Sequence, residues 1–322
     1  MNAPAFDLVG VGLNATDTLL LVSKYPELGG KVAFEREILS PGGQVATALA
    51  TCGKLGLRTK YLGVVGDDER GRIQIASLRE AGLNPGGASM NLDDVEIRAG
   101  CPNQSAYIVI DQSTGERTIF WHRPDCLTID PARITPEKIV CARMLHVDGH
   151  DTPAVACAAR IARDHGIPVS VDVDNVYPGF DQVLACVDYL VGSTEFPARW
   201  TGERDLFLAL ERIQNEYGTR LVAMTLGPYG ALAREGERFI YSPGFVVNCA
   251  DTTGAGDVFH GAFCYSVLKG ASVRDALEFS NAMAALNCTK LGARGGIATA
   301  GEARDLIERG ERRSHPDFTH NS

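Results

Sequence analysis

The 322-residue sequence predicts an α/β protein with one large, mostly parallel sheet and a small second sheet inserted into it. Two observations predict this class. From residue 140 to 290, strand-like apolar runs alternate with helical patterns, a rhythm typical of parallel strands joined by helices on both sheet faces. Residues 17–40 and 97–123 have strand character without intervening helices, which indicates the separate sheet.

The main-sheet elements follow in chain order. Each strand is a short apolar run, and each helix shows an amphipathic or Ala-rich pattern. We expect strands at 6–12, 61–66, 143–148, 168–173, 188–192 and 221–226, and helices at 44–54, 153–165 and 205–217. Ligands of such sheets bind at the carboxyl ends of the strands.

The small sheet contains a predicted hairpin. Residues 106–110 and 118–121 flank a turn at 113–116. Ile108, Ile110, Ile119 and Trp121 are expected to be exposed apolar residues of these strands. Since a small sheet cannot bury both faces alone, one face should cover a ligand and the other should meet a partner.

Composition narrows the class of protein. A net charge of −9 argues against a general nucleic-acid binder, although a local anion site remains compatible with it. Nine scattered cysteines without a Cys-x-x-Cys pair predict reduced, cytosolic thiols. No apolar run reaches about 18 residues and no cleavable leader is evident, so we expect no membrane span and a cytoplasmic location.

The most informative segment is Asp251-Thr252-Thr253-Gly254-Ala255-Gly256-Asp257, directly followed by an apolar helical pattern. Small residues let the unpaired N–H groups of a helix start approach a ligand, and the helix dipole favours an anion there. Gly254, Ala255 and Gly256 therefore predict an anion hole for a phosphoryl group, with Asp257 as a general base. The alternative is a Gly-rich turn in which Asp257 only caps the helix.

This segment resembles the signature of the ribokinase-like (PfkB) carbohydrate kinases. Residues 41–56, which begin Pro-Gly-Gly-Gln, resemble the family's first signature, and residues 61–71 match the strand and turn after it. The resemblance implies a three-layer α/β/α kinase domain over 1–309, with a lid at 17–40 and 97–123, and leaves a polar, frayed tail at 310–322. It also implies an ATP-dependent sugar kinase that requires Mg²⁺, binds K⁺ and dimerises through the lid.

The family pattern implies a set of substrate contacts. Asp17 matches the acceptor of sugar hydroxyls, and backbone at Gly42 and Gly43 would approach the sugar. Thr47 departs from the Asn common in the family. Together with residues 258–261 and 284–289, Thr47 is closest to the sulfofructose kinase branch, where Lys31 fits the anion-reading set. Trp121 occupies a place where that branch would have a polar or basic group, as does Asp148.

The family resemblance also implies binding sites for the nucleotide and for cations. For the nucleotide, Thr225, Gly227 and Gly230 would line phosphates or ribose, and Asn281 the adenine side. Ser193 and Glu195 fall, at compressed spacing, where the family organises Mg²⁺ through water. The predicted potassium site comprises Asp251 and Thr253 with carbonyls of a second loop, namely those of Asn287, Lys290, Gly292 and Gly296.

Other interpretations stay open at this stage. His146, Asp148 and His150 alternate along one strand, which allows substrate contact, a structural role or a metal site. Residues 10–15 satisfy a Gly-x-Gly-x-x-Ala dinucleotide pattern, but the sequence after it reads as a strand rather than the required helix. A nucleoside kinase on the same fold and a sugar-sensing module are the other candidates.

Overall fold

The computed structural model describes residues 3–81 and 90–313. Within them, nine strands form the main sheet: β1 Phe6–Val11, β4 Thr59–Gly66, β5 Val95–Arg98, β8 Ala142–Val147, β9 Val169–Val173, β10 Tyr189–Gly192, β11 Leu221–Thr225, β12 Gly230–Glu235 and β13 Arg238–Pro243. Their order is β13-β12-β11-β10-β9-β8-β1-β4-β5. Only the β11–β12 and β12–β13 pairs are antiparallel. The mostly parallel sheet is confirmed.

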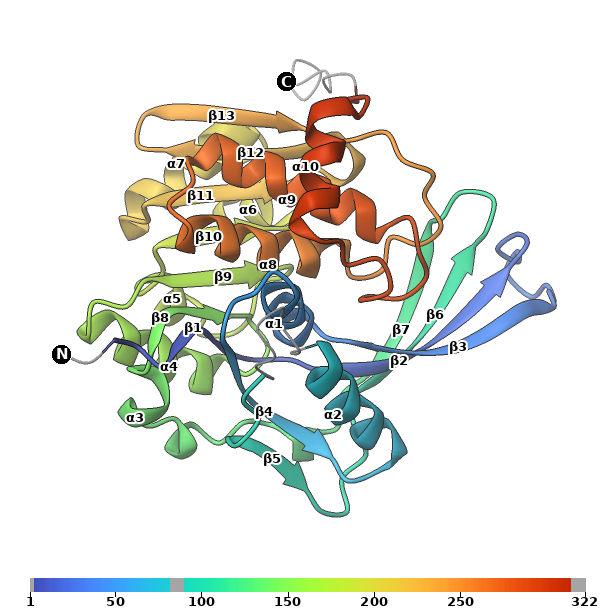
Figure 1. Cartoon of the computed structure of the whole chain (residues 1–322), viewed down its shortest axis with the longest axis horizontal. Coiled ribbons are helices and arrows are strands. Elements are labelled where there is room, and N and C mark those ends of the chain that lie inside the picture. Colours follow the sequence, from blue (N-terminus) through green and yellow to red (C-terminus); the bar gives the residue numbers. More distant parts are fainter. Residues whose placement is uncertain (1–2, 82–89, 314–322) are drawn as a thin grey trace.

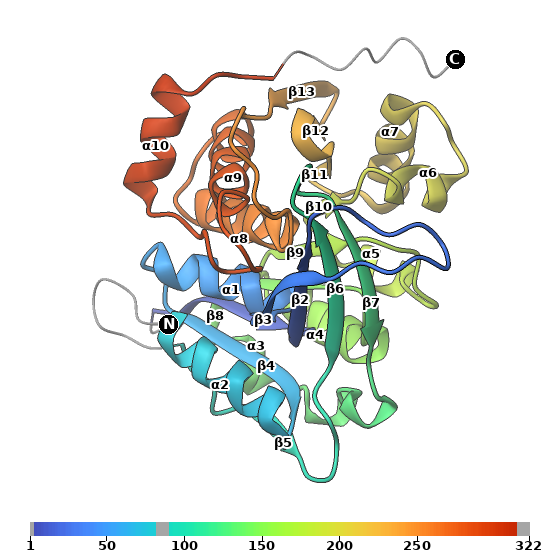
Figure 2. The ribbon, with the colours of Figure 1, turned by 90° about the vertical axis from the view of Figure 1, so that its right-hand side faces the viewer.

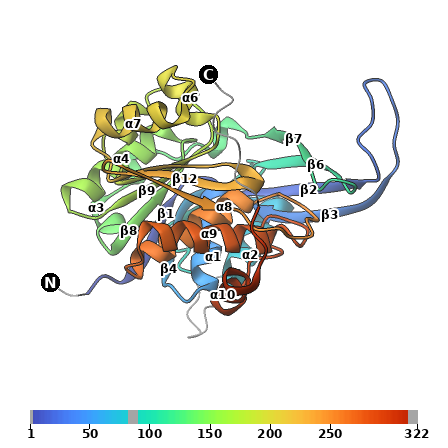
Figure 3. The ribbon, with the colours of Figure 1, turned by 90° about the horizontal axis from the view of Figure 1, so that it is seen from above.

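Helices cover both faces of this sheet, as Figures 1 and 3 show. One layer contains α3 Pro136–Ile139, α4 Thr152–Asp164, α5 Asp181–Leu184, α6 Phe196–Thr201 and α7 Leu206–Tyr217. The other contains α1 Gln44–Lys54, α2 Glu69–Ala81, α8 Ala255–Leu268, α9 Val273–Asn287 and α10 Ala300–Arg309. Short 3₁₀ turns lie at Asp125–Leu127, Pro131–Arg133 and Gly227–Tyr229. The predicted three layers are present, and the helix at 44–54 has the predicted bounds.

The second sheet contains β2 Ala15–Val22, β3 Phe34–Gly42, β6 Ser105–Asp111 and β7 Arg117–His122, in the order β3-β2-β6-β7. It projects from one end of the main sheet (Figures 1 and 2). Since β2 follows β1 directly, the Gly-x-Gly-x-x-Ala pattern is not followed by a helix. Residues 97–98 of the predicted lid segment instead belong to β5, at the edge of the main sheet.

The two faces of the small sheet differ. Ile108 and Ile110 are buried with Leu19 and Leu21, so the expectation that these isoleucines are exposed is wrong. Leu291, from a loop far along the chain, packs against this cluster. We call this the inner face; Ile119 and Trp121 share it by register but are 44% and 64% exposed at its edge.

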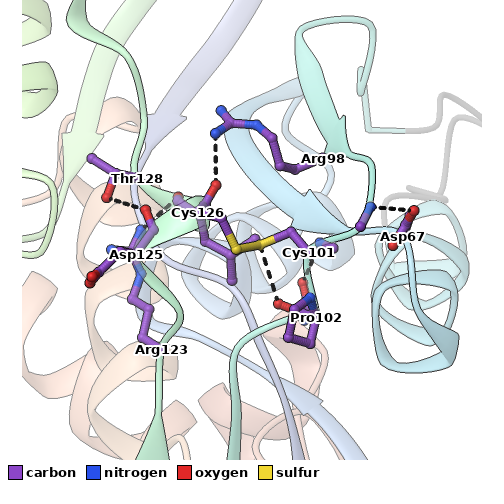
Figure 4. Close-up of a disulfide and its surroundings, with 12 residues drawn as sticks. Asp67, Arg98, Cys101, Pro102, Arg123, Asp125, Cys126 and Thr128 are labelled. Carbon is purple, nitrogen blue, oxygen red and sulfur yellow. Dashed lines mark hydrogen bonds between the residues drawn. A yellow bond between two sulfur atoms is a disulfide. The ribbon is translucent and has the colours of Figure 1, made fainter.

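Cys101 and Cys126 form a disulfide, which corrects the prediction that all nine cysteines are free thiols (Figure 4). Cys101 precedes β6 and Cys126 follows β7, so the bond closes a loop that contains the whole β6–β7 hairpin. Neither cysteine belongs to a local motif, because the pairing depends on the hairpin bringing both ends of the segment back to the body.

The start of the predicted tail is anchored rather than frayed. Arg312 pairs with Glu278 at 2.6 Å, lies over the Phe245 ring and forms a β-bridge with Phe245. The amide of Arg313 donates to Gly244 O. Residues 314–322 lie outside the described residues. Within the described part, no helix is both long and apolar enough to cross a bilayer.

Candidate active site

The segment 251–257 forms the start of α8, as its small residues predict. Gly254 is the N-cap with φ 73°, and a Cβ there would come within 2.5 Å of Ala293 O, so glycine is required at this position. Gly256 is exposed, and a Cβ there would meet nothing within 4 Å, so the space beside the helix start is open. The site therefore presents backbone amides and a favourable dipole to an anion.

The sugar-side residues meet this helix start through Ala293. Asp17 is buried, and a Cβ on Gly42 would lie 3.0 Å from Asp17 Oδ2 and 3.3 Å from Ala293 Cβ. Gly43 has φ 95° and approaches the backbone of Asn14 too closely for any side chain. The fold thus brings residues 17, 42, 254 and 293 together from four separate parts of the chain.

Asp17 has the properties of an acceptor for ligand hydroxyls. Its Oδ1 is buried and has no hydrogen-bond partner among the described residues. Burial raises the pKa of Asp17 to about 6, against the opposing charges of Arg70 and Arg294. A buried carboxylate with a free oxygen gains from any hydroxyl donor that enters the site.

Arg294 is the main residue that the sequence analysis missed. Its guanidinium donates to Thr47 Oγ1 at 3.2 Å, Ser77 Oγ at 3.0 Å and Gly42 O at 2.9 Å. Burial lowers the pKa of Arg294 to about 10, while Asp257 and Asp17 favour its charged form. Thr47 is fully buried beneath it, so in this structure its hydroxyl binds Arg294 rather than facing a ligand. No local pattern marks Arg294, because its partners come from distant segments.

The Asp257 carboxyl has an altered proton affinity. Burial and then the nearby Asp172 carboxylate raise its pKa to about 7, while His260, Arg117 and Arg294 act in the opposite direction. Asp172 accepts a hydrogen bond from His260 Nε2 at 3.1 Å. Burial raises the pKa of Asp172, but His260 outweighs burial and holds that pKa below its usual value. A base poised near neutral pH suits proton transfer from a hydroxyl.

The two predicted lid contacts lie differently. Trp121 pairs with Ala106, so by register it lies on the same face of the small sheet as Asp17. Lys31 is exposed in the connection between β2 and β3. Arg123, beside Trp121, forms a 2.5 Å ion pair with Asp151.

The predicted nucleotide residues lie just after β10, at the end of β11, in the turn that leads into β12 and on α9. Thr225 O accepts from Thr194, which lies between Ser193 and Glu195, so these two segments are adjacent. Glu195 is exposed at the start of α6. Gly227 and Gly230 have φ 55° and 99°, and a Cβ on Gly230 would clash with Ser242 O. Asn281 is buried and donates to Ser242 O and Oγ at 3.0 Å, so its amide nitrogen binds β13.

The two predicted potassium loops are in contact. Asp251 accepts from the amides of Thr253 and Gly292, both at 2.8 Å, and is fully buried. Asn287 Nδ2 donates to the carbonyls of Thr253 and Ala293, and its Oδ1 accepts from Gly296 N at 3.1 Å. Thr253 Oγ1 is buried without a partner among the described residues. One carboxylate among carbonyl oxygens suits a hard cation, so the residues fit K⁺; Lys290, at the loop's start, is exposed.

The alternating polar residues of β8 have structural partners. His146 is fully buried and contacts Cys264, and Asp148 accepts from the amides of Leu13 and His150. Burial lowers the pKa of His146 to about 3. Within residues 3–81 and 90–313, no group of three or more His, Cys, Asp or Glu is arranged to hold a metal. Asp148 therefore holds the β1–β2 connection through Leu13, while His146 packs against α8.

Comparison with known proteins decides the family. The profile of the pfkB family carbohydrate kinases matches residues 11–300. The chain belongs to this family. An ATP-dependent ribose-1-phosphate kinase of Halopiger xanaduensis is 28% identical over 304 residues, 91% of this chain and 95% of the relative. The ribokinase of Bacillus subtilis is 26% identical over 305 residues, 92% of this chain and 98% of the relative.

Solved structures agree with the fold of this pfkB kinase. Arabidopsis thaliana ribokinase complexed with ribose and ATP has a TM-score of 0.75 at 23% identity, covering 95% of this chain and 99% of the other. Adenosine kinase from Sinorhizobium meliloti has a TM-score of 0.77 at 20% identity, covering 94% and 98%. At such identities the likeness establishes the fold. The predicted family, its fold and its class of activity, an ATP-dependent sugar kinase, are confirmed.

Proposed function

We propose that this pfkB kinase transfers the γ-phosphoryl group of ATP to a hydroxyl of a sugar or sugar derivative, with Asp257 as the general base. The observation that carries the proposal is the arrangement around Ala293. Ala293 packs against Gly42 on one side and against Gly254 on the other, so a sugar hydroxyl near Asp17 would lie close to the anion hole. Positioning of this kind supplies much of the catalysis in phosphoryl transfer.

In this proposal the residues of the site bind the sugar, accept its proton and stabilise the phosphoryl group. Asp17 and the backbone at Gly42 and Gly43 hold hydroxyls of the sugar, and Trp121 covers it from the lid. Asp257 takes the proton of the attacking hydroxyl, for which a pKa of about 7 is well matched. Amides of Gly254, Ala255 and Gly256 bind the phosphoryl oxygens as negative charge shifts towards the leaving group.

Nucleotide and cations are assigned to the neighbouring loops. We place the nucleotide along Thr225, Gly227 and Gly230, with Asn281 near the adenine side. Ser193 and Glu195 would order Mg²⁺ through water, and Mg²⁺ would neutralise phosphate charge during transfer. Potassium would lie between Asp251, Thr253 and the 287–296 loop, where it would order the amides that begin α8. A cytoplasmic location remains a prediction.

The identity of the sugar or sugar derivative that accepts the phosphoryl group stays open. The likeness to the sulfofructose kinase branch remains a prediction. The relatives are named for ribose 1-phosphate, ribose and fructose kinase activities. A nucleoside kinase is the second candidate, since an adenosine kinase shares the fold.

We also propose a homodimer through the outer face of the small sheet. Leu39, Tyr107 and Phe120 are 45%, 53% and 59% exposed and stand in one cross-strand row. An apolar stripe of this kind on a four-stranded sheet favours pairing with a second copy.

The function is tested by offering Mg·ATP with sugars, sugar phosphates, sulfonated sugars and nucleosides, and by following the gain of one phosphoryl group by mass spectrometry. We expect a phosphorylated sugar or sugar derivative, and none with Asp257→Asn. A product formed only from nucleosides would favour the second candidate. Turnover by Asp257→Asn close to that of the wild type would contradict the role of the base.

A further inference from the structure

Helix α2 lies beside the start of the small sheet and contacts the two segments that we assign to the sugar (Figure 1). Arg70 and Gln74 are four residues apart in α2, so they share one side of the helix. Arg70 contacts β2 on both sides of Asp17. Gln74 Nε2 donates to Gly42 O at 3.3 Å. The helix therefore supports both the carboxylate and the backbone of the proposed sugar site from behind.

Arg70 is hydrogen-bonded to both neighbours of Asp17 in β2. Its Nη1 donates to Thr16 O at 2.6 Å, and its Nη2 donates to Thr18 Oγ1 at 2.7 Å. The hydroxyl of Thr16 donates in turn to Arg70 O at 2.9 Å. Because a planar guanidinium fixes the two acceptors that it joins, these bonds hold the strand at the residues on either side of Asp17.

The alternation of a strand puts Arg70 and the Asp17 carboxylate on opposite faces of the small sheet. Thr18 pairs with Tyr107 on the outer face, and the Arg70 guanidinium lies 5.8 Å from the centre of the Tyr107 ring. Asp17 projects from the inner face, and its Oδ1 is buried without a partner among the described residues. The arginine thus acts from behind and leaves this oxygen open to a ligand.

Two cations influence the Asp17 carboxyl, Arg70 from α2 and Arg294 from the loop before α10. Burial raises the pKa of Asp17 to about 6, while a hydrogen bond from the backbone of Ala106 and then the charges of Arg70 and Arg294 limit the rise. The ionised carboxylate accepts hydrogen bonds at both oxygens, whereas the protonated carboxyl donates from one of them. Arg70 therefore favours the form of Asp17 that accepts from sugar hydroxyls.

We propose that Arg70 is a positioning residue for the sugar: it holds Asp17 in place through Thr16 and Thr18 and faces the carboxylate with a positive charge. This inference rests on the proposed kinase function, in which Asp17 binds the sugar. Because α2 belongs to the body, the start of β2 would keep its place while the outer part of the small sheet opens and closes. The acceptor of sugar hydroxyls would then be ready before closure.

The test compares Arg70→Met with Arg72→Met. Arg72 lies two residues later in α2, is exposed and donates to Asp67 O at 3.0 Å, so it is a matched arginine of the same helix. We expect Arg70→Met to raise the KM of the acceptor by roughly 10- to 100-fold, with kcat and the KM of ATP within about threefold. Arg72→Met should match the wild type. Arg70→Lys, which keeps the charge but loses the planar fork, should lie between them.

A double-mutant cycle shows whether Arg70 acts through Asp17. Asp17→Asn should raise the KM of the acceptor at least as much as Arg70→Met does, and Arg70→Met should then raise it by less than about threefold more. If the effects of the two substitutions multiply, Arg70 acts by another route and the inference is overturned. It is also overturned if Arg70→Met lowers Tm and changes kcat and both KM values together, because a residue that only stabilises the fold would do so.

The dependence on pH separates the charge of Arg70 from its hydrogen bonds. In the wild type, 1/KM for the acceptor should fall as pH decreases through about 6, where Asp17 takes up a proton. Without the cation the pKa of Asp17 is higher, so Arg70→Met should begin this fall at a higher pH, while Arg70→Lys should keep the midpoint of the wild type.

A second measurement of the same midpoint does not depend on turnover. The NMR signal of the Asp17 carboxyl carbon, identified by its loss in Asp17→Asn, should titrate at a higher pH in Arg70→Met than in the wild type, Arg72→Met or Arg70→Lys. Equal midpoints in the wild type and Arg70→Met would overturn the inference. If the wild type phosphorylates no acceptor, the proposed function fails, and the carboxyl titration still decides whether Arg70 acts on Asp17.

Discussion

The main sheet and the small sheet are stabilised in different ways. Every residue of β9 is buried, whereas every residue of β7 is exposed. Helices cover both faces of the main sheet. The small sheet packs its inner face against Leu291 and the loop before α8, and on its outer face only Arg70 of α2 bonds Thr16 and Thr18 and lies over the Tyr107 ring, among the contacts of the described residues. The geometry of the body is therefore set by its own core, while the position of the small sheet depends on contacts with α2 and with the loops beside α8 and α9.

This difference assigns different kinds of work to the two regions. The proposed base, the proposed anion hole and the partly buried Arg294 belong to the body, where preorganisation would lower the barrier without further rearrangement. Trp121 and Arg117 belong to the small sheet, which we propose to be a lid that opens and closes. Substitutions in the body should change the chemical step, and substitutions in the lid should change closure and assembly. The predictions below test that division.

The largest effect is expected for Asp257→Asn in the body. Loss of a general base should lower kcat by roughly 10²–10⁴-fold while ATP binding is retained. Asp305→Asn, on the exposed surface of α10, is the control and should be neutral. Steady-state kinetics and nucleotide titration test both variants. A normal kcat for Asp257→Asn would show that another group is the general base.

The next effect concerns pH. Since Asp257 must be ionised to accept a proton and its pKa is about 7, kcat/KM should fall about tenfold per pH unit below pH 7.

The same raised pKa means that the folded state holds the proton more tightly than the unfolded state does. The Asp257 carboxyl therefore lowers the free energy of unfolding as pH rises from about 4 to about 7. Asp257→Asn should remove that slope, as urea unfolding at pH 5 and pH 8 would measure. A kcat/KM profile that is flat from pH 5 to 8 would exclude Asp257 as the titrating base.

Local sequence patterns predicted most strands of the main sheet and the helix starts of α1 and α8. Helix α1 was predictable because Gly43 precedes an unbroken apolar pattern, and β8 to β11 were predictable because each is a short apolar run between helices. The start of α8 was predictable because three small residues precede Asp257. In each case the determining residues are adjacent in the sequence.

Long-range packing explains what was missed. Ile108 and Ile110 were predicted to be exposed, but they are buried because Leu21 and Leu291, which are far away in the sequence, pack against the same face. Arg294 has no local signature, since Thr47 and Ser77 reach it from other elements. The Cys101–Cys126 bond likewise exists because a hairpin returns to its starting point.

A smaller effect is expected on assembly. Phe120→Ser removes an apolar side chain from the outer face of the lid, and in a symmetric dimer the loss counts twice. At about 1.5 kcal/mol per buried side chain, the dimer dissociation constant should rise about 100-fold. Light scattering over a concentration series measures it, with Val140→Ser, a 38% exposed position on the body, as the control. A wild-type protein that is monomeric at micromolar concentration would contradict the dimer itself.

The smallest effect on the chemical step should come from the bond at the base of the hairpin, which acts on the stability of the fold. The sequence separation of Cys101 and Cys126 is 25, so the closed loop should stabilise the fold by about 3 kcal/mol, and the Cys101→Ser/Cys126→Ser double variant should melt several degrees lower. Because the bond joins the two ends of the β6–β7 hairpin, hydrogen exchange should rise in residues 105–122 more than in β8 to β11. Reductant should reproduce both changes in the wild type and should leave the double variant unaffected. If exchange rises equally in the lid and the main sheet, the bond stabilises the whole fold and the two regions are not independent.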